Sequence, residues 1–239
     1  MKKTEIILTG LILLLNAACS TITSDQQTVS RSASVAKVPA QQLDTVRAGV
    51  KALEAAGSVQ RGGLYLREID GESYLFQYVE NSGSGEAGFQ GLEAWLEPLP
   101  AAARKGLVRE PMERIFYEAG VADKTPEMDV MRIAMFTELK PEKEAHYRLL
   151  HDNPWPDVIA AIHKANFRHF SVFLEEIDGR VYLFGWLEYV GSDIDADGAE
   201  NKKDPASIRW WKETDACQIA PPDADGGMWG GMEEILFVK

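Results

Sequence analysis

Two stretches of the chain decide its fold: residues 64–80 read LYLREIDGESYLFQYVE, and residues 172–188 read VFLEEIDGRVYLFGWLE. They align without a gap, and each places two runs rich in β-branched and aromatic residues around an Asp-Gly pair. Asp-Gly between such runs is the strongest short-range signal for a β-hairpin. We therefore predict two equivalent hairpins, one in each half of the chain.

The repeat extends beyond the hairpins. Residues 111–115 (PMERI) resemble residues 231–235 (GMEEI), and Trp95 falls near the place that Trp210 and Trp211 take in the second copy. Three matches in the same order indicate a duplication. In the second copy we predict strands at 132–139, 170–176, 180–190 and 234–238, and helices at 142–150, 157–164 and 208–219.

This order of elements is the ferredoxin-like order, if the stretches at 142–150 and 157–164 count as one broken helix. The first copy has the same pieces at 43–120, but its first strand is not evident. We predict an α+β fold in which tandem ferredoxin-like units form a pseudo-dimeric α+β barrel within one chain. Pairing between chains stays open as an alternative.

The N-terminus predicts export. Lys2 and Lys3 precede an apolar run at 6–15, too short to span a bilayer, and a small pair leads directly to Cys19. This is the pattern of a lipoprotein signal, in which the thiol of Cys19 is acylated. An ordinary secretory signal with a chance cysteine is the alternative. The following Ser20 favours the periplasmic face of the bacterial outer membrane over other parts of the cell envelope.

These features divide the chain into five expected segments. They are a signal peptide at 1–18, a flexible tether at 19–42, a degenerate first copy at 43–120, a linker at 121–130 and a second copy at 131–239. The tether is expected because 20–42 is rich in Ser, Thr, Gln and Ala and lacks aromatic residues. With Cys19 acylated, Cys217 has no partner for a disulfide bond.

The net charge of the chain bears on which classes of molecule it can bind. The net charge of −12 argues against nucleic acid, because phosphate neutralisation needs clustered Lys and Arg. We expect contact with the membrane only through the lipid anchor.

All four histidines lie in the second copy, and one of them, His151, lies at helical spacing from two aromatic residues. Tyr147, His151 and Trp155 are spaced four apart, so they share one face if the helix continues. A phenol, an imidazole and an indole suit a sugar, through hydrogen bonds, proton transfer and stacking on a ring face. The alternative is that Tyr147 and Trp155 only pack, and that His151 is a core or solvated histidine.

The sequence of the segment that contains Tyr147, His151 and Trp155 resembles that of the L-rhamnose mutarotase family. The resemblance covers about 131–239 and continues, in order, through the motifs YRLLHDNPWPDV (147–158), FSVFL (170–174), LF (183–184), WWK (210–212) and the run at 232–238. It implies a ferredoxin-like fold with a sugar pocket and the interconversion of the α and β anomers of L-rhamnose or a similar sugar. His151 matches the catalytic histidine, and Tyr147 the tyrosine that accompanies it. Trp155, Trp210 and Trp211 match aromatic residues of the substrate pocket.

The implied reaction opens and recloses a pyranose ring by acid/base chemistry, for which histidine is suited and no cofactor is needed. Two other functions stay open: a carbohydrate-binding envelope lipoprotein without catalysis, and a structural envelope protein. The hairpin alignment puts Leu43 in the place of His151 and Arg47 in that of Trp155, so the first copy lacks the catalytic set.

One acidic segment resembles a calcium-binding loop. Its candidate ligands are Asp193, Asp195, Asp197 and Asp204. A strand is expected before it instead of a helix, and the last ligand is not Glu. A solvated acidic loop is therefore the favoured interpretation.

Overall fold

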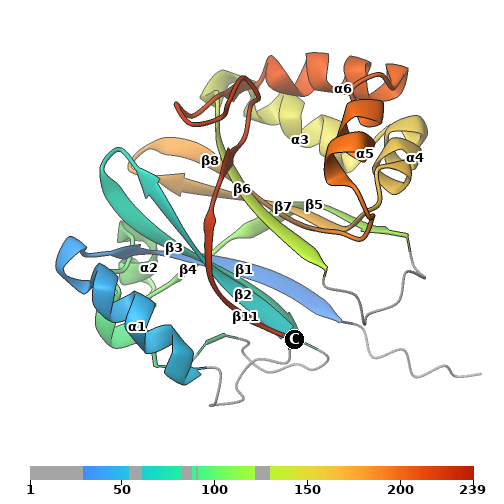
Figure 1. The fold of residues 1–239 in the computed structure, drawn as a ribbon. Helices are drawn as coiled ribbons and strands as arrows, with labels where there is room; N and C mark the ends of the chain where they lie inside the picture. Colours follow the sequence, from blue (N-terminus) through green and yellow to red (C-terminus); the bar gives the residue numbers. More distant parts are fainter. Residues whose placement is uncertain (1–28, 54–60, 82–87, 90, 122–129) are drawn as a thin grey trace, which may run out of the picture.

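The computed structural model describes residues 29–53, 61–81, 88–89, 91–121 and 130–239 (Figure 1). The signal segment and Cys19 lie outside the described residues. The first half contains β1 (Ser30–Val38), the 3-10 helix η1 (Ala40–Gln42), α1 (Leu43–Leu53), β2 (Arg61–Ile69), β3 (Glu72–Asn81), η3 (Glu93–Trp95), α2 (Pro100–Arg104), β4 (Glu110–Pro111) and β5 (Glu113–Gly120). The second half contains β6 (Met131–Leu139), η4 (Pro141–Lys143), α3 (Glu144–Asp152), α4 (Pro156–Lys164), β7 (Phe167–Ile177), β8 (Arg180–Tyr189), α5 (Ile194–Asn201), α6 (Pro205–Asp215), β9 (Gln218–Ile219), β10 (Gly230–Gly231) and β11 (Glu233–Val238).

Both predicted hairpins form, β2–β3 in the first half and β7–β8 in the second. Their turns have positive φ at both central residues, 52° and 80° at Asp70 and Gly71, and 51° and 78° at Asp178 and Gly179. Two positive φ values are the signature of a type I′ turn, whose twist matches that of the strands that it joins. The Asp-Gly pairs therefore set the register of both hairpins.

The predicted tether at 19–42 is wrong from Ser30 onward, because β1 occupies Ser30–Val38 and pairs with the whole length of β3. This strand is the missing first strand of the first copy. Its small side chains are what made it resemble a tether. They suit a strand with neighbours on both sides, and Val35, Ala36 and Val38 have no exposed surface. Tertiary packing overrides weak local propensity here.

The assignment of Leu43 and Arg47 to the places of His151 and Trp155 is also wrong. The first strand, the 3-10 helix and the helix that follows it each begin 101 residues later in the second half than in the first, as at Leu43 and Glu144 for the two helices. The hairpin sequences, in contrast, are 108 residues apart, as at Leu64 and Val172. At the smaller offset Val46 matches Tyr147 and Val50 matches His151. Both valines are buried, as are the residues they match. The first half still lacks the predicted catalytic pair.

The two halves exchange their last strands. One sheet has the order β11-β2-β3-β1-β4 and the other β10-β6-β8-β7-β5, with β9 paired to β6. Thus β5 from the first half pairs antiparallel with β7, and β11 from the second half pairs antiparallel with β2. The molecule is a mixed α+β fold with antiparallel sheets, in which neither sheet is built from one half alone.

The sheets meet through a shared aromatic core, and the helices lie on their outer sides (Figure 1). Phe76 stacks on Phe184 with ring centroids 5.4 Å apart, and Tyr78 stacks on Trp186 at 3.9 Å. The Trp186 indole donates a 2.8 Å hydrogen bond to the Tyr65 hydroxyl. Aromatic pairs of this kind contribute beyond their buried area.

Charged residues at one end of this core also join the halves. Glu188, which is fully buried, pairs with Arg61 of the first half and with Arg168 of its own half, the latter at 2.6 Å. Breaking a buried pair of this kind leaves an uncompensated charge, so it strongly disfavours separation of the halves. Over the described residues, no helix has the length and apolar character that crossing a bilayer requires.

Candidate functional site

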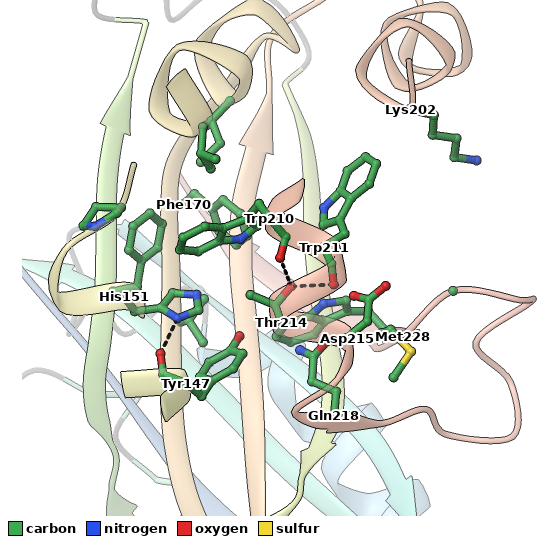
Figure 2. A pocket seen from close by; sticks show the side chains of 17 residues that line it. Tyr147, His151, Phe170, Lys202, Trp210, Trp211, Thr214, Asp215, Gln218 and Met228 are labelled. Atoms are coloured by element: carbon green, nitrogen blue, oxygen red, sulfur yellow. Dashed lines mark hydrogen bonds between the residues drawn. The ribbon is translucent and has the colours of Figure 1, made fainter. Parts of the chain in front are cut away.

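A cavity of about 370 Å³ lies between the helices of the second half and the outer face of its sheet (Figure 2). The walls come from α3, α4, α6, β5, β7, β9 and the loop before β10. Its lining residues are Phe116, Tyr147, His151, Pro154, Val158, Ile162, Phe170, Val172, Lys202, Trp210, Trp211, Thr214, Asp215, Gln218, Gly227, Met228 and Trp229. The surface is mostly aromatic and aliphatic, with a few polar groups among them, which is the usual make-up of a small-molecule site.

Tyr147 and His151 lie one helical turn apart on α3, and both are buried. Their rings stack with centroids 4.2 Å apart and 28° between planes. The Nδ1 atom of His151 is 2.9 Å from the carbonyl oxygen of Tyr147. A carbonyl can only accept, so Nδ1 carries the hydrogen in the neutral ring and Nε2 keeps its lone pair.

Burial determines the charge of both groups. It lowers the pKa of His151 to about 4, because the imidazolium loses hydration, although the Tyr147 carbonyl opposes the shift. Burial also raises the pKa of Tyr147 well above its ordinary value. At neutral pH the site therefore combines a neutral imidazole with a protonated phenol. An exposed histidine titrates near neutrality, and desolvation accounts for the difference at His151.

The tryptophans lie at different depths. Trp210 meets His151 edge to face at 5.2 Å, and it lines the cavity together with Trp211. Trp155 packs edge to face on Trp210 at 5.4 Å from behind, outside the lining of the cavity. The helix does not continue to Trp155 as the spacing assumed, because prolines follow Asn153 and Trp155 and disfavour helical backbone there.

The first half contributes a wall that sequence reasoning missed. Phe116 on β5 meets the His151 ring edge to face at 5.4 Å and the Phe170 ring at 5.6 Å. Phe116 lies far along the chain from the other residues of the site, so the sequence gives no reason to expect this contact. Only the exchange of β5 into the second sheet brings Phe116 to the cavity.

Polar side-chain contacts hold both site helices against this exchanged strand. Arg148 of α3 donates hydrogen bonds of 2.7 and 2.9 Å to the two carboxylate oxygens of Glu113 on β5. His163 of α4 lies 2.8 Å from the carboxylate of Glu118, further along β5. This contact gives His163 a structural role.

Comparison with known proteins identifies the second half. A family model described as L-rhamnose mutarotase matches residues 132–237. The L-rhamnose mutarotase of Acidiphilium cryptum is 32% identical over 94 residues, which cover 39% of this chain and 85% of that protein. The chain belongs to the L-rhamnose mutarotase family.

Other members of the mutarotase family match the same half. The L-rhamnose mutarotase of Mesorhizobium japonicum is 28% identical over 93 residues, which cover 38% of this chain and 83% of that protein. The L-rhamnose mutarotase of Bacillus subtilis is 33% identical over 71 residues, which cover 30% of this chain and 64% of that protein. Among solved structures, a putative monooxygenase from Fusobacterium nucleatum covers 88% of this chain and 94% of its own, with 10% identity and a TM-score of 0.48.

In the first half, the place that corresponds to this cavity is filled with side chains. Val46 and Val50 replace the tyrosine and histidine, and the Trp95 ring packs directly against Gly49. A Cβ atom at Gly49 would lie 2.3 Å from Cη2 of Trp95, so glycine is needed for this close approach. The first half thus packs solidly where the second half is hollow.

The acidic segment does not form the calcium loop that its spacing suggested. Residues 194–201 form helix α5, and the Asp193 carboxylate caps it by accepting from the Ala196 amide at 2.9 Å. Asp204 caps α6 in the same way. Asp197 accepts from the Tyr189 hydroxyl at 2.7 Å. These carboxylates face different partners, and no three His, Cys, Asp or Glu residues in the described ranges converge as metal ligands.

Proposed function

We propose that the protein is a mutarotase that interconverts the α and β anomers of L-rhamnose or a similar sugar. The observation that carries this proposal is the buried His151–Tyr147 pair, which faces a cavity otherwise walled by aromatic and aliphatic groups. Membership of the mutarotase family supports the same chemistry. Trp210 and Trp211 supply flat faces against which a sugar ring can stack.

The proposed reaction uses His151 in both directions. Nε2 takes the proton of the anomeric hydroxyl, the C1–O5 bond breaks, and C1 becomes an aldehyde carbon. The imidazolium then returns its proton to the ring oxygen, and its low pKa makes it a strong donor. The aldehyde rotates about C1–C2, and the reverse steps close the ring on its other face. The phenol of Tyr147 stays protonated and donates a hydrogen bond to a sugar oxygen.

The first test is the variant His151→Ala, assayed for anomer exchange of L-rhamnose by NMR saturation transfer. We expect a fall of at least ~100-fold, the usual contribution of a positioned acid or base. His146→Ala is the matched control, because His146 lies on the same helix with an exposed side chain. Unchanged exchange in His151→Ala would remove the imidazole from the mechanism.

A carbohydrate-binding protein without catalysis is the second candidate. The low pKa of His151 favours it, since a weak base is a poor acceptor of the first proton. Both candidates bind sugar, but only the mutarotase accelerates exchange. Sugar binding by calorimetry, together with exchange at the spontaneous rate for every sugar of a panel, would select the binding protein.

We also propose that the chain is a pseudo-dimer, with two ferredoxin-like units forming one barrel. The exchange of β5 and β11 between the sheets supports this, because each unit then completes the other. The first unit begins at β1, and its role is to close the barrel and supply one wall of the site.

The last proposal concerns location. We propose that the thiol of Cys19 is acylated and anchors the protein in the cell envelope, on the periplasmic face of the outer membrane. Labelling of cells with a radioactive fatty acid tests this. We expect label in the wild-type protein and none in Cys19→Ser, and an unlabelled wild type would contradict the proposal.

A further inference from the structure

One polar side chain of the cavity has no structural role that the fold explains. Gln218 is the first residue of β9, directly after the short turn that follows α6. Its backbone is fixed, because β9 pairs with β6 at Leu139 and the amide of Lys140 donates to the neighbouring Cys217 carbonyl at 2.8 Å. The side chain projects into the cavity, while that of Ile219 is 43% exposed. Gln218 is therefore presented rigidly to whatever occupies the cavity.

The amide of Gln218 is buried, and the fold leaves its hydrogen-bonding groups unsatisfied. The residue is 3% exposed, and neither its nitrogen nor its oxygen makes a hydrogen bond with the described part of the chain. The phenol of Tyr147 lies beside the amide (Figure 2), near enough for a weak polar interaction that slightly opposes the rise in the pKa of Tyr147, but outside normal hydrogen-bond geometry. A buried donor and acceptor left unpaired destabilise the folded state. A group of this kind at the wall of a cavity can be satisfied by a molecule that enters the cavity.

A second buried glutamine, Gln77, provides a comparison, because its amide has hydrogen-bond partners within the fold. Gln77 on β3 is also 3% exposed. Its oxygen accepts from the Phe89 amide at 3.0 Å and from Arg109 at 2.7 Å, and its nitrogen donates to the Ser34 hydroxyl at 3.3 Å. The fold therefore provides partners for both the nitrogen and the oxygen of a buried amide where that amide supports structure.

We propose that Gln218 recognises the sugar by binding two neighbouring ring hydroxyls, with its nitrogen donating to one oxygen and its oxygen accepting from the other. A hydroxyl pair offers both an acceptor and a donor, which is what a primary amide requires. Gln218 lies beside Tyr147, so these hydroxyls belong to the ring that His151 opens. This inference rests on the proposed function and adds its specificity-determining residue.

The test compares Gln218→Met with Gln77→Met, since Met keeps the length of the side chain and removes its hydrogen-bonding groups. The Kd for L-rhamnose is measured by calorimetry, and Tm by calorimetric unfolding without sugar. In Gln218→Met we expect the Kd to rise by about 10- to 100-fold, and the Tm to stay equal or rise because an unpaired buried amide is removed. In Gln77→Met we expect the reverse, a lower Tm with an unchanged Kd.

The recognised hydroxyls can then be located with monodeoxy sugars. An analogue that lacks a contacted hydroxyl should bind the wild type more weakly, and Gln218→Met should weaken its binding no further. Gln218→Glu provides a second variant of the same shape. It loses the donor but keeps the acceptors, so we expect its Kd to rise as well.

An unchanged Kd in Gln218→Met and Gln218→Glu would overturn the inference, whatever their Tm. If the wild type exchanges anomers while these variants bind as it does, the mutarotase proposal stands and only the role of Gln218 fails. If the wild type neither binds sugars nor exchanges them, both fail together.

Discussion

At the scale of the residue, the site depends on how burial changes ordinary side chains. His151 is a neutral acceptor because it is desolvated, and its tautomer follows from one hydrogen bond to the backbone. The sequence could identify His151 and Tyr147 as the residues to examine. It could not give the charge state, because burial depends on Phe116 and Trp210, which come from distant parts of the chain.

The depressed pKa of His151 predicts acid sensitivity. Between pH 6.5 and about 4 the unfolded chain binds a proton at this position that the folded chain does not, so stability falls as pH falls through this window. The loss from this group is about 2 kcal/mol at pH 5. His151→Gln should therefore lose less stability than the wild type between pH 7 and pH 5, measured by urea unfolding. Equal losses in the two proteins would contradict the shift.

At the scale of the element, β5 is the part whose role the sequence did not reveal. The hairpins, α3, α4 and the break between them at the prolines were predicted, because turn chemistry and periodicity are local. Helix α5 was not predicted, and the helix predicted at 208–219 runs from Pro205 to Asp215 and is followed by the strand β9. Which sheet edge β5 joins is not local, and it decides that Glu113 holds α3 and that Phe116 covers His151.

Phe116→Ala tests the contribution of β5 to the site. Loss of this ring admits water beside His151, so we expect its pKa to rise toward 6.5, followed by NMR titration of the ring. Anomer exchange should fall as well. Leu236→Ala is the matched control, since Leu236 holds the corresponding place on β11 and packs in the first half. Both variants should lose about 2–5 kcal/mol of stability, but only the first should change His151.

At the scale of the whole molecule, the halves depend on each other. Phe76 and Tyr78 of the first half stack on Phe184 and Trp186 of the second, and Arg61 pairs with the buried Glu188. An isolated half exposes this aromatic face and the edge of β7. The matching of the mutarotase family to the second half alone therefore does not make that half independent.

A chain of residues 131–239 alone should consequently self-associate. We expect its sedimentation coefficient to rise with concentration in analytical ultracentrifugation, because an exposed apolar face and an open strand edge both promote pairing. Residues 29–239 serve as the control and should not depend on concentration in this way. A cooperative, monomeric second half would contradict the mutual dependence of the halves.

The amino-acid sequence by itself determined both hairpins with their Asp-Gly turns, the helices α3 and α4 with the break between them, and the positions of Tyr147 and His151. These features are local, because turn type and side-chain period depend on near neighbours. Only the tertiary structure decided that β1 is a strand, that β5 and β11 change sheets, and that the Gln218 amide is left unpaired beside the cavity. Each depends on contacts between distant segments, whose free energy arises only when the sheets close around a common core.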